Sequence, residues 1–574
     1  MSDAPKKSYR TGVLLLLTLV YGFNFIDRQI VGILAPWIQT DLDLTNTQLG
    51  LLIGLAFAAF YTIMGIPLAF LADRINRVSL LSAALAVWSG FTALTGVSQN
   101  FLHIAFARVG VGIGEAGGSP PSHSMISDFY GKEERAGALG VYSLGIPLGI
   151  MVAYFLTAAL MGSDPDTVDW RRIFILLGFM GLFLAVIVRL MVVEPQRGAI
   201  DAEGTPDLPS IKFNDSYKSL AMFLGFIVAF AFLTQLLNAS DMFLGTSLNW
   251  DVVTIMIMLF GVIVAIMTRL SIQTPEKRKL IGKQPKTTKA PSGYIPLGQS
   301  FRDANLPPRA LVFGGVLAAL IIGVITGIVS ILVLVLVSFF LITMFLLSLQ
   351  PGVMTILSIK SWWWMALGIA FASFASYAIS GFQTKFLRLL DPDFSPRTFI
   401  IWIGIINGTF YVAGTFFGAK LVDWRAKKDI RAYGTIPAIS ILLAFPLAMA
   451  AFWAPSVVLH LAIGAALQLC LGVYLGPSFA IAQTLAPIKL RAMSTALFFF
   501  VLNMIALGGG PTFAGAMIDV FINKGAGELG ATRSAMYVTF GAYILAFFFY
   551  MLVRKSLPKD WADAEARNEQ ASST

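Results

Sequence analysis

Four ionisable residues interrupt stretches of this sequence that are otherwise apolar enough to cross a membrane. Asp27 and Arg28 lie in the first such stretch, and Arg108 and Glu115 lie in the fourth. A charge at the bilayer centre costs roughly 2.5–3.5 kcal/mol on an insertion scale, so such residues generally mark ion, proton or substrate pathways. The pattern predicts that these side chains face the interior of a helical bundle.

The first stretch, Thr11–Ile38, can insert despite its two charges. The two charges oppose insertion by roughly 5–7 kcal/mol together. Fifteen Leu, Ile, Val and Phe residues favour it by roughly 5–9 kcal/mol. Asp27 and Arg28 point about 100° apart on a helix, so they cannot both serve one partner. Asn24, one turn earlier, shares a face with both of them.

Arg108 and Glu115 are seven residues apart, which places them on one face of a helix two turns apart. A low-dielectric bundle disfavours an ionised carboxylate, whereas a nearby arginine favours it. Such a balance makes protonation depend on which side of the membrane the group meets, as proton coupling requires. A structural ion pair with an arginine is the alternative for Asp27 and for Glu115.

Glycines recur every four residues around Glu115, at Gly110, Gly114 and Gly118, and predict the close approach of another helix. The same stretch contains a GxGxxG pattern. A dinucleotide site is excluded there because no strand precedes the pattern and the stretch is apolar.

The composition predicts an all-α protein that crosses the membrane many times. Hydrophobic residues make up 57% of the 574 residues and charged residues 13%, against about 25% charged in soluble proteins. The mean hydropathy is +0.77. One cysteine and three scattered histidines predict neither a disulfide nor a metal site, and we expect no cofactor and no nucleic acid partner.

Two sets of six spans are predicted, in residues 1–193 and 361–574. The first set is Thr11–Ile38, Leu49–Leu71, Val78–Val97, Phe101–Ile126, Ala136–Met161 and Ile173–Val193. The second set is Trp362–Leu387, Thr398–Val422, Arg431–Trp453, Ser456–Leu485, Ala492–Phe521 and Ala535–Val553. Basic residues concentrate in alternate loops, which places both termini in the cytoplasm of an inner (plasma) membrane protein.

Residues 194–360 are too long and too apolar for a simple connection between the two sets. We expect four further spans there, giving sixteen in all; fourteen is the alternative if the apolar run Ala310–Ser348 does not cross. A strongly basic cytoplasmic loop, Thr274–Lys289, is expected to face anionic membrane lipids.

The two sets repeat one another. "AFLADRINR" follows the second span, and "AKLVDWRAK" follows the second span of the later set. Asp73 and Asp423 each lie 62 residues after the start of their set, counted from Thr11 and from Ser361. Duplication of a six-helix unit is typical of transporters, whose substrate site lies between the halves.

Several motifs resemble a known family. "GIPLAFLADRINR" is similar to the loop signature of the major facilitator superfamily. "NFIDRQ", "RVGVGIGEAGGSPPSHSMISDFYGKEERAGALGVYSLGIPLG" and "LRAMSTALFFFVLNMIALGGGP" resemble the Spinster-like branch and its bacterial relatives. The resemblance covers both six-span halves and leaves residues 194–360 aside.

The resemblance implies a role for each ionisable residue. Asp27 and Glu115 match carboxylates that are implicated in proton coupling. Arg28 and Arg108 are then expected to tune them and to meet an anionic substrate group, with Asn24 beside them. It also implies a cytoplasmic gate, in which Asp73 caps a helix of the other half. The expected gate residues are Asp73, Arg74, Arg77, Asp128, Arg135, Asp423 and Arg425; marking topology by solvated charge is their alternative.

We therefore expect a major facilitator fold and a secondary transporter that works by alternating access, driven by protons. Its expected substrate is an amphiphilic or anionic organic solute of the lysolipid or sphingoid kind. A small organic acid or drug-like solute is the alternative within this class. A membrane-embedded lipid-modifying enzyme is the alternative outside it, for which His123 near Asp128 is the sole suggestion. Substrate identity, direction of transport and oligomeric state stay open.

Overall fold

The computed structural model describes residues 7–72, 75–161, 168–195, 356–487 and 491–573, and nearly all of them are helical. The N-terminal half contains α1 (Lys7–Ile33), α2 (Ala35–Asp41), α3 (Asn46–Ile53), α4 (Leu55–Ala72), α5 (Arg77–Gly96), α6 (Phe101–Glu115), α7 (Ser119–Phe129), α8 (Lys132–Ser143), α9 (Gly145–Leu160) and α10 (Trp170–Met191). The four extra spans predicted within residues 194–360 lie outside the described residues.

The C-terminal half also consists mainly of apolar helices. It contains α18 (Lys360–Leu390), α19 (Pro396–Ile406), η1 (Asn407–Tyr411), α20 (Val412–Ala426), α21 (Ala432–Trp453), α22 (Val457–Val473), α23 (Leu475–Thr484), α24 (Arg491–Leu502), η3 (Asn503–Gly508), α25 (Gly509–Asn523) and α26 (Glu528–Ser573).

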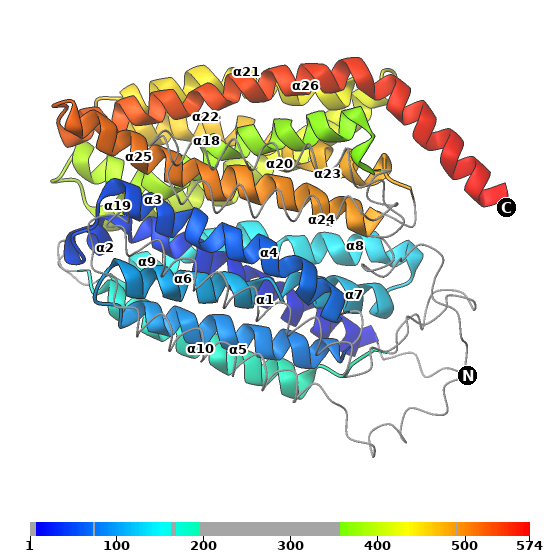
Figure 1. The fold of residues 1–574 in the computed structure, drawn as a ribbon, viewed down its shortest axis with the longest axis horizontal. Coiled ribbons are helices and arrows are strands. Elements are labelled where there is room, and N and C mark those ends of the chain that lie inside the picture. Colours follow the sequence, from blue (N-terminus) through cyan, green and yellow to red (C-terminus); the bar gives the residue numbers. More distant parts are fainter. Residues whose placement is uncertain (1–6, 73–74, 162–167, 196–355, 488–490, 574) are drawn as a thin grey trace, which may run out of the picture.

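The two halves lie side by side with their helices roughly parallel (Figure 1). The blue-to-cyan helices of the N-terminal half form one layer, and the green-to-red helices of the C-terminal half form the other. We call the end of the bundle at which α1 begins and α26 ends the terminal end, and the opposite end the distal end. This arrangement of two helical bundles matches the predicted fold class.

Ten helical stretches in the described part of the chain are long and apolar enough to span a membrane. They correspond to ten of the twelve predicted spans. The other two, the second and the fourth, are each divided into two shorter helices. The second is divided between α3 and α4 at Gly54, and the fourth between α6 and α7 at residues 116–118.

Local chemistry explains both divisions. At Gly54 the backbone of the other half comes so close that a Cβ atom would lie 2.8 Å from the carbonyl oxygen of Gly508. After Glu115, a glycine pair is followed by Pro120 and Pro121, which donate no backbone hydrogen bond and therefore interrupt a continuing helix.

The glycines near Glu115 pack against α5, as their spacing predicts. A Cβ atom at Gly114 would lie 2.7 Å from Cβ of Trp88, and the ring of Phe91 covers Gly110. This contact fixes α6 against α5 and holds Trp88 next to Glu115.

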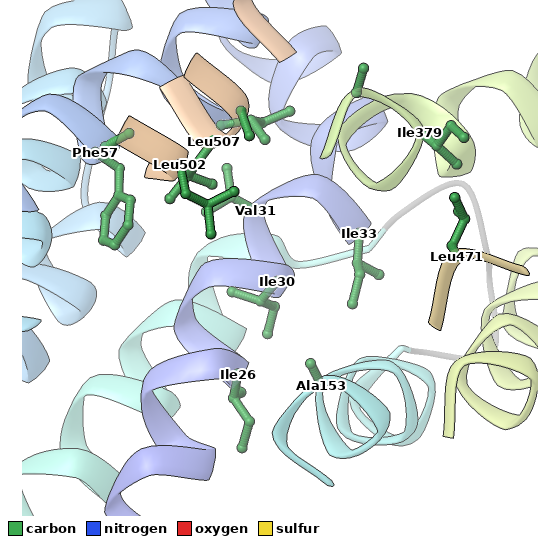
Figure 2. Close-up of a cluster of buried hydrophobic side chains, with 14 of the residues drawn as sticks. Ile26, Ile30, Val31, Ile33, Phe57, Ala153, Ile379, Leu471, Leu502 and Leu507 are labelled. Atoms are coloured by element: carbon green, nitrogen blue, oxygen red, sulfur yellow. The ribbon is translucent and has the colours of Figure 1, made fainter. Parts of the chain in front are cut away.

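Apolar side chains around α1 join the two halves. Figure 2 shows Ile30 and Val31 of α1 near Leu502 and Leu507, which come from the far half of the chain. Ile30 and Val31 are completely buried, and Leu507 is 5% exposed. The core of the protein therefore continues from one half into the other instead of ending at their boundary.

Polar contacts between the halves gather at the distal end. The Ser380 hydroxyl donates to Oε1 of Gln29 over 2.9 Å, and Thr512 donates to the Gly50 carbonyl over 3.3 Å. On the other side of the bundle α9 packs against α19, where Gly404 meets Tyr154. The halves are thus held together where α2, α3 and α19 lie (Figure 1).

Candidate functional site

An ion pair buried in the N-terminal half is the centre of the candidate site. Nε of Arg28 donates to Oε2 of Glu115 over 2.7 Å, joining α1 to α6. The side chains are 12% and 0% exposed. Because burying a charge is costly unless it is paired, each residue depends on the other to be tolerated at this depth.

Aromatic rings enclose both arginines of the site. The Arg28 guanidinium carbon lies 4.3 Å from the ring centroid of Tyr61 and 5.1 Å from that of Phe57. The Arg108 guanidinium carbon lies 5.0 Å from the same Phe57 ring. Cation–π attraction of this kind is strongest where water is excluded.

Tyrosines from both halves surround Arg28, and no sequence motif pointed to them. Tyr21 and Tyr61 from the N-terminal half and Tyr377 from the C-terminal half are electrostatic neighbours of its guanidinium. Tyr21 also stacks on Tyr142, with ring centroids 4.4 Å apart. The charged centre is therefore surrounded by phenol groups that can donate and accept hydrogen bonds.

Asp27 lies next to this ion pair without joining it. It is completely buried, and neither carboxylate oxygen has a hydrogen-bond partner. Arg108 and Glu115 are its charged neighbours, and Asn24 lies beside Glu115. The structure therefore brings together all five residues predicted for proton coupling and substrate binding, and Arg28 but not Asp27 forms an ion pair with Glu115.

Two of the predicted gate residues, Arg77 and Asp128, form a network at the terminal end. Arg77 is completely buried; it pairs with Asp128, donates to Oε1 of Glu194 over 2.7 Å and to the Pro195 carbonyl over 2.8 Å. These bonds tie the start of α5 to α7 and to the end of α10. The network is much more buried than solvated topology markers would be.

The other predicted gate residues are more dispersed. Asp73 and Arg74 lie outside the described residues. Arg135 donates to the Ser127 carbonyl over 2.7 Å within its own half. In the C-terminal half, Asp423 accepts a 3.0 Å hydrogen bond from the Tyr433 hydroxyl, and Arg425 is exposed. Their joint action as a gate stays a prediction.

The distal end carries a second polar network that the motifs did not predict. The Asp519 carboxylate of α25 accepts from the backbone N–H and the hydroxyl of Thr47, over 2.7 and 2.6 Å. The Asn46 amide donates to its other oxygen over 2.8 Å. Asp519 therefore sits at the N-terminus of α3, where the helix dipole favours a negative charge.

Lys385 extends this distal network. Its ammonium donates to Gln39 over 2.8 Å and to Asn46, and it pairs with Glu528 over 2.7 Å. Lys385 and Asp519 are ionisable residues inside apolar stretches, the same signal that identified Asp27 and Glu115. That signal could have found them from the sequence.

The described residues contain no cluster of three or more His, Cys, Asp and Glu side chains that could hold a metal ion. His123 stacks edge-on against Tyr142, with centroids 5.0 Å apart, and Asp128 is bonded to Arg77.

The sequence model of the Major Facilitator Superfamily matches residues 17–361. The chain belongs to this superfamily. The relatives that the chain matches there are transporters, which favours the transporter over the lipid-modifying enzyme expected as its alternative.

Individual members of the superfamily resemble parts of the chain. It is 34% identical over 179 residues to an MFS-type efflux pump of Mycolicibacterium smegmatis, covering 31% of this chain and 40% of that one. It is 31% identical over 180 residues to a probable L-galactonate transporter of Escherichia coli, covering 31% and 39%. It is 28% identical over 223 residues to Protein spinster of Drosophila melanogaster, covering 38% and 34%. Each alignment spans two fifths of the relative's length or less.

A solved structure from the superfamily shares the complete fold. The crystal structure of a bacterial homolog of the human lysosomal transporter Spinster, inward-facing and unoccupied, superposes with a TM-score of 0.65. The alignment covers 97% of this chain and 99% of that one at 24% identity. The similarity confirms the major facilitator fold, and the partial match to Protein spinster agrees with the predicted resemblance to the Spinster-like branch.

Proposed function

We propose that the chain is a secondary active transporter that couples the movement of an anionic organic substrate to protons. The buried Arg28–Glu115 pair is the observation that carries this proposal. A guanidinium paired with a titratable carboxylate can exchange that partner for the acidic group of a substrate.

The coupling follows from the cost of an unpaired buried charge. When a substrate anion replaces Glu115 at Arg28, the released carboxylate either remains as an uncompensated charge or takes up a proton. Proton uptake avoids the cost, so binding of the substrate and binding of the proton favour each other. Asp27, whose carboxylate has no direct partner, supplies a second exchangeable proton, with Arg108 and Asn24 completing the site.

We propose that the acidic group belongs to an amphiphile of the lysolipid or sphingoid kind, in keeping with the Spinster-like motifs. The phenols around Arg28 favour a second candidate, a small hydroxylated acid. Tyr61 and Tyr377 approach the guanidinium from opposite halves and could bind hydroxyl groups next to a carboxylate. The partial similarity to a probable L-galactonate transporter supports this second candidate.

We propose that the terminal end faces the cytoplasm, because the basic loops predicted from the sequence lie on that side. The polar contacts of Asp519 and Lys385 then close the opposite side of the membrane. In the alternate state they part, and the gate residues around Asp73, Arg77 and Asp423 bring the cytoplasmic ends together.

The test is uptake by purified protein in liposomes, with and without an imposed pH gradient. Two substrate panels are compared, single-chain lipid phosphates and hydroxylated monocarboxylates such as hexonates. We expect uptake of one panel to be driven by the gradient, and Asp27→Asn and Glu115→Gln to abolish the uphill component. Asp429→Asn, an exposed position, is the control. Gradient-driven uptake by the Asp27→Asn, Glu115→Gln double variant would refute proton coupling at this site.

A further inference from the structure

Polar atoms without hydrogen-bond partners are concentrated around Asp27. They belong to side chains that are at most 4% exposed. They include Oδ1 of Asn24, both carboxylate oxygens of Asp27, Nε1 of Trp88, Oγ1 of Thr92, Nε of Arg108 and Oε1 of Glu115. Buried polar groups in native proteins are almost always satisfied, by other groups or by ordered water. Their concentration at one place indicates a small buried hydration site.

Two of these groups are donors from α5. Trp88 and Thr92 are four residues apart, so they share one face of that helix. Both lie within hydrogen-bonding reach of the Asp27 carboxylate, although their polar atoms and the carboxylate oxygens do not meet the geometry of a direct hydrogen bond. A water molecule that accepts from these donors and donates to Asp27 satisfies all of them.

Packing of α5 on α6 limits the movement of the Trp88 indole. The Trp88 side chain is completely buried. A Cβ atom added at Gly114 would lie only 2.7 Å from the Cβ atom of Trp88. The indole is thus held by the packing of α5 on α6. A fixed donor that stops short of direct hydrogen-bond geometry can still reach the carboxylate through one water molecule.

We propose that Trp88 and Thr92 are positioning residues that hold the Asp27 carboxylate through ordered water. The proposal rests on the proposed role of Asp27 in proton coupling. Donors delivered to a carboxylate stabilise its ionised form, so this face of α5 sets the pH at which Asp27 takes up its proton. Two charged groups face Asp27, and both of them, Arg108 and Glu115, come from α6. The donors contributed by α5 are neutral.

Difference infrared spectroscopy of the full-length protein in lipid tests this without a known substrate. The carbonyl stretch of the protonated carboxylic acid is titrated with pH and assigned to Asp27 by its loss in Asp27→Asn. We expect Thr92→Val and Trp88→Phe each to move the midpoint of this titration to higher pH by about one unit. Thr95→Val is the matched control, since this hydroxyl is equally buried but donates to the Phe91 carbonyl over 3.0 Å.

The outcomes separate the two levels of the proposal. Thr92→Ser retains the donor and should restore the midpoint of the unaltered protein, which a purely structural role would not require. If no titrating band disappears in Asp27→Asn, the proposed function itself fails. If the band is assigned to Asp27 but its midpoint moves no further in Thr92→Val and Trp88→Phe than in Thr95→Val, the positioning role is overturned.

Discussion

Thr47 donates two hydrogen bonds to the same carboxylate oxygen of Asp519, one from its backbone N–H over 2.7 Å and one from its hydroxyl over 2.6 Å. The two residues belong to different halves of the protein. A carboxylate of α25 thus completes the N-terminus of α3, and it can do so only while the distal ends of the halves are together.

Asp519→Asn should therefore weaken closure of the distal end. The change removes the charge that the helix N-terminus favours, a contribution of about 0.3–1 kcal/mol that rises to about 2 kcal/mol when partly buried. We expect the distal ends to separate in a larger fraction of molecules. Double electron–electron resonance measures the distance between the distal ends. Spin labels are attached at Thr40→Cys and Arg397→Cys, exposed positions on the two halves, after Cys470 is replaced.

The control for this experiment is Asp393→Asn, which removes a carboxylate from an exposed distal loop. It should leave the distance distribution unchanged. Identical distributions for Asp519→Asn and Asp393→Asn would mean that the contact with Thr47 does not hold the halves together.

The two carboxylates of the central site should differ in their effect on stability. Glu115→Gln leaves the Arg28 guanidinium buried without its anion, and breaking such a pair costs about 3–5 kcal/mol. Asp27→Asn removes a buried carboxylate that has no hydrogen-bond partner, so it should leave stability unchanged or raise it. Thermal unfolding midpoints in detergent compare the variants; equal losses would contradict the unequal pairing seen in the structure.

Arg77→Ala should destabilise the terminal end of the N-terminal half. The change leaves Asp128 and Glu194 without the cation that joins them, at a cost of about 3–5 kcal/mol. Arg172→Ala, at an exposed position on α10, should have little effect on the unfolding midpoint. If the two variants unfold at the same temperature, the Arg77 network contributes no net stability.

Gly54→Ala should hinder closure at the distal end. The new Cβ would lie 2.8 Å from the Gly508 carbonyl oxygen and 2.9 Å from that of Leu507, closer than packed atoms allow. We expect a cost of about 1–3 kcal/mol in the distally closed state and slower transport. Gly65→Ala is the matched control, because nothing lies within 4 Å of its Cβ position. Equal transport rates for both variants would show that this close approach is not required.

Much of the fold could be predicted from local features of the sequence. Apolar runs predicted the ten membrane-spanning stretches found in the described part of the chain, and the spacing of Gly110, Gly114 and Gly118 placed a helix against this part of α6. These local features did not predict the helix breaks at Gly54 and beyond Glu115. A hydrophobic run predicts that a segment enters lipid. The approach of a neighbouring helix backbone decides where the helix of that segment breaks.

The sequence by itself determined which residues belong inside the bundle, because burying Asp27, Arg28, Arg108 or Glu115 is costly anywhere in the chain. Only the tertiary structure decided their partners. Arg108 shares a helix face with Glu115, but seven residues of helix separate them by about 10 Å along the axis, whereas the packing of α1 brings Arg28 to 2.7 Å. Asp519 meets Thr47 across 472 residues, a pairing that depends on how the halves dock and leaves no periodic trace in the sequence.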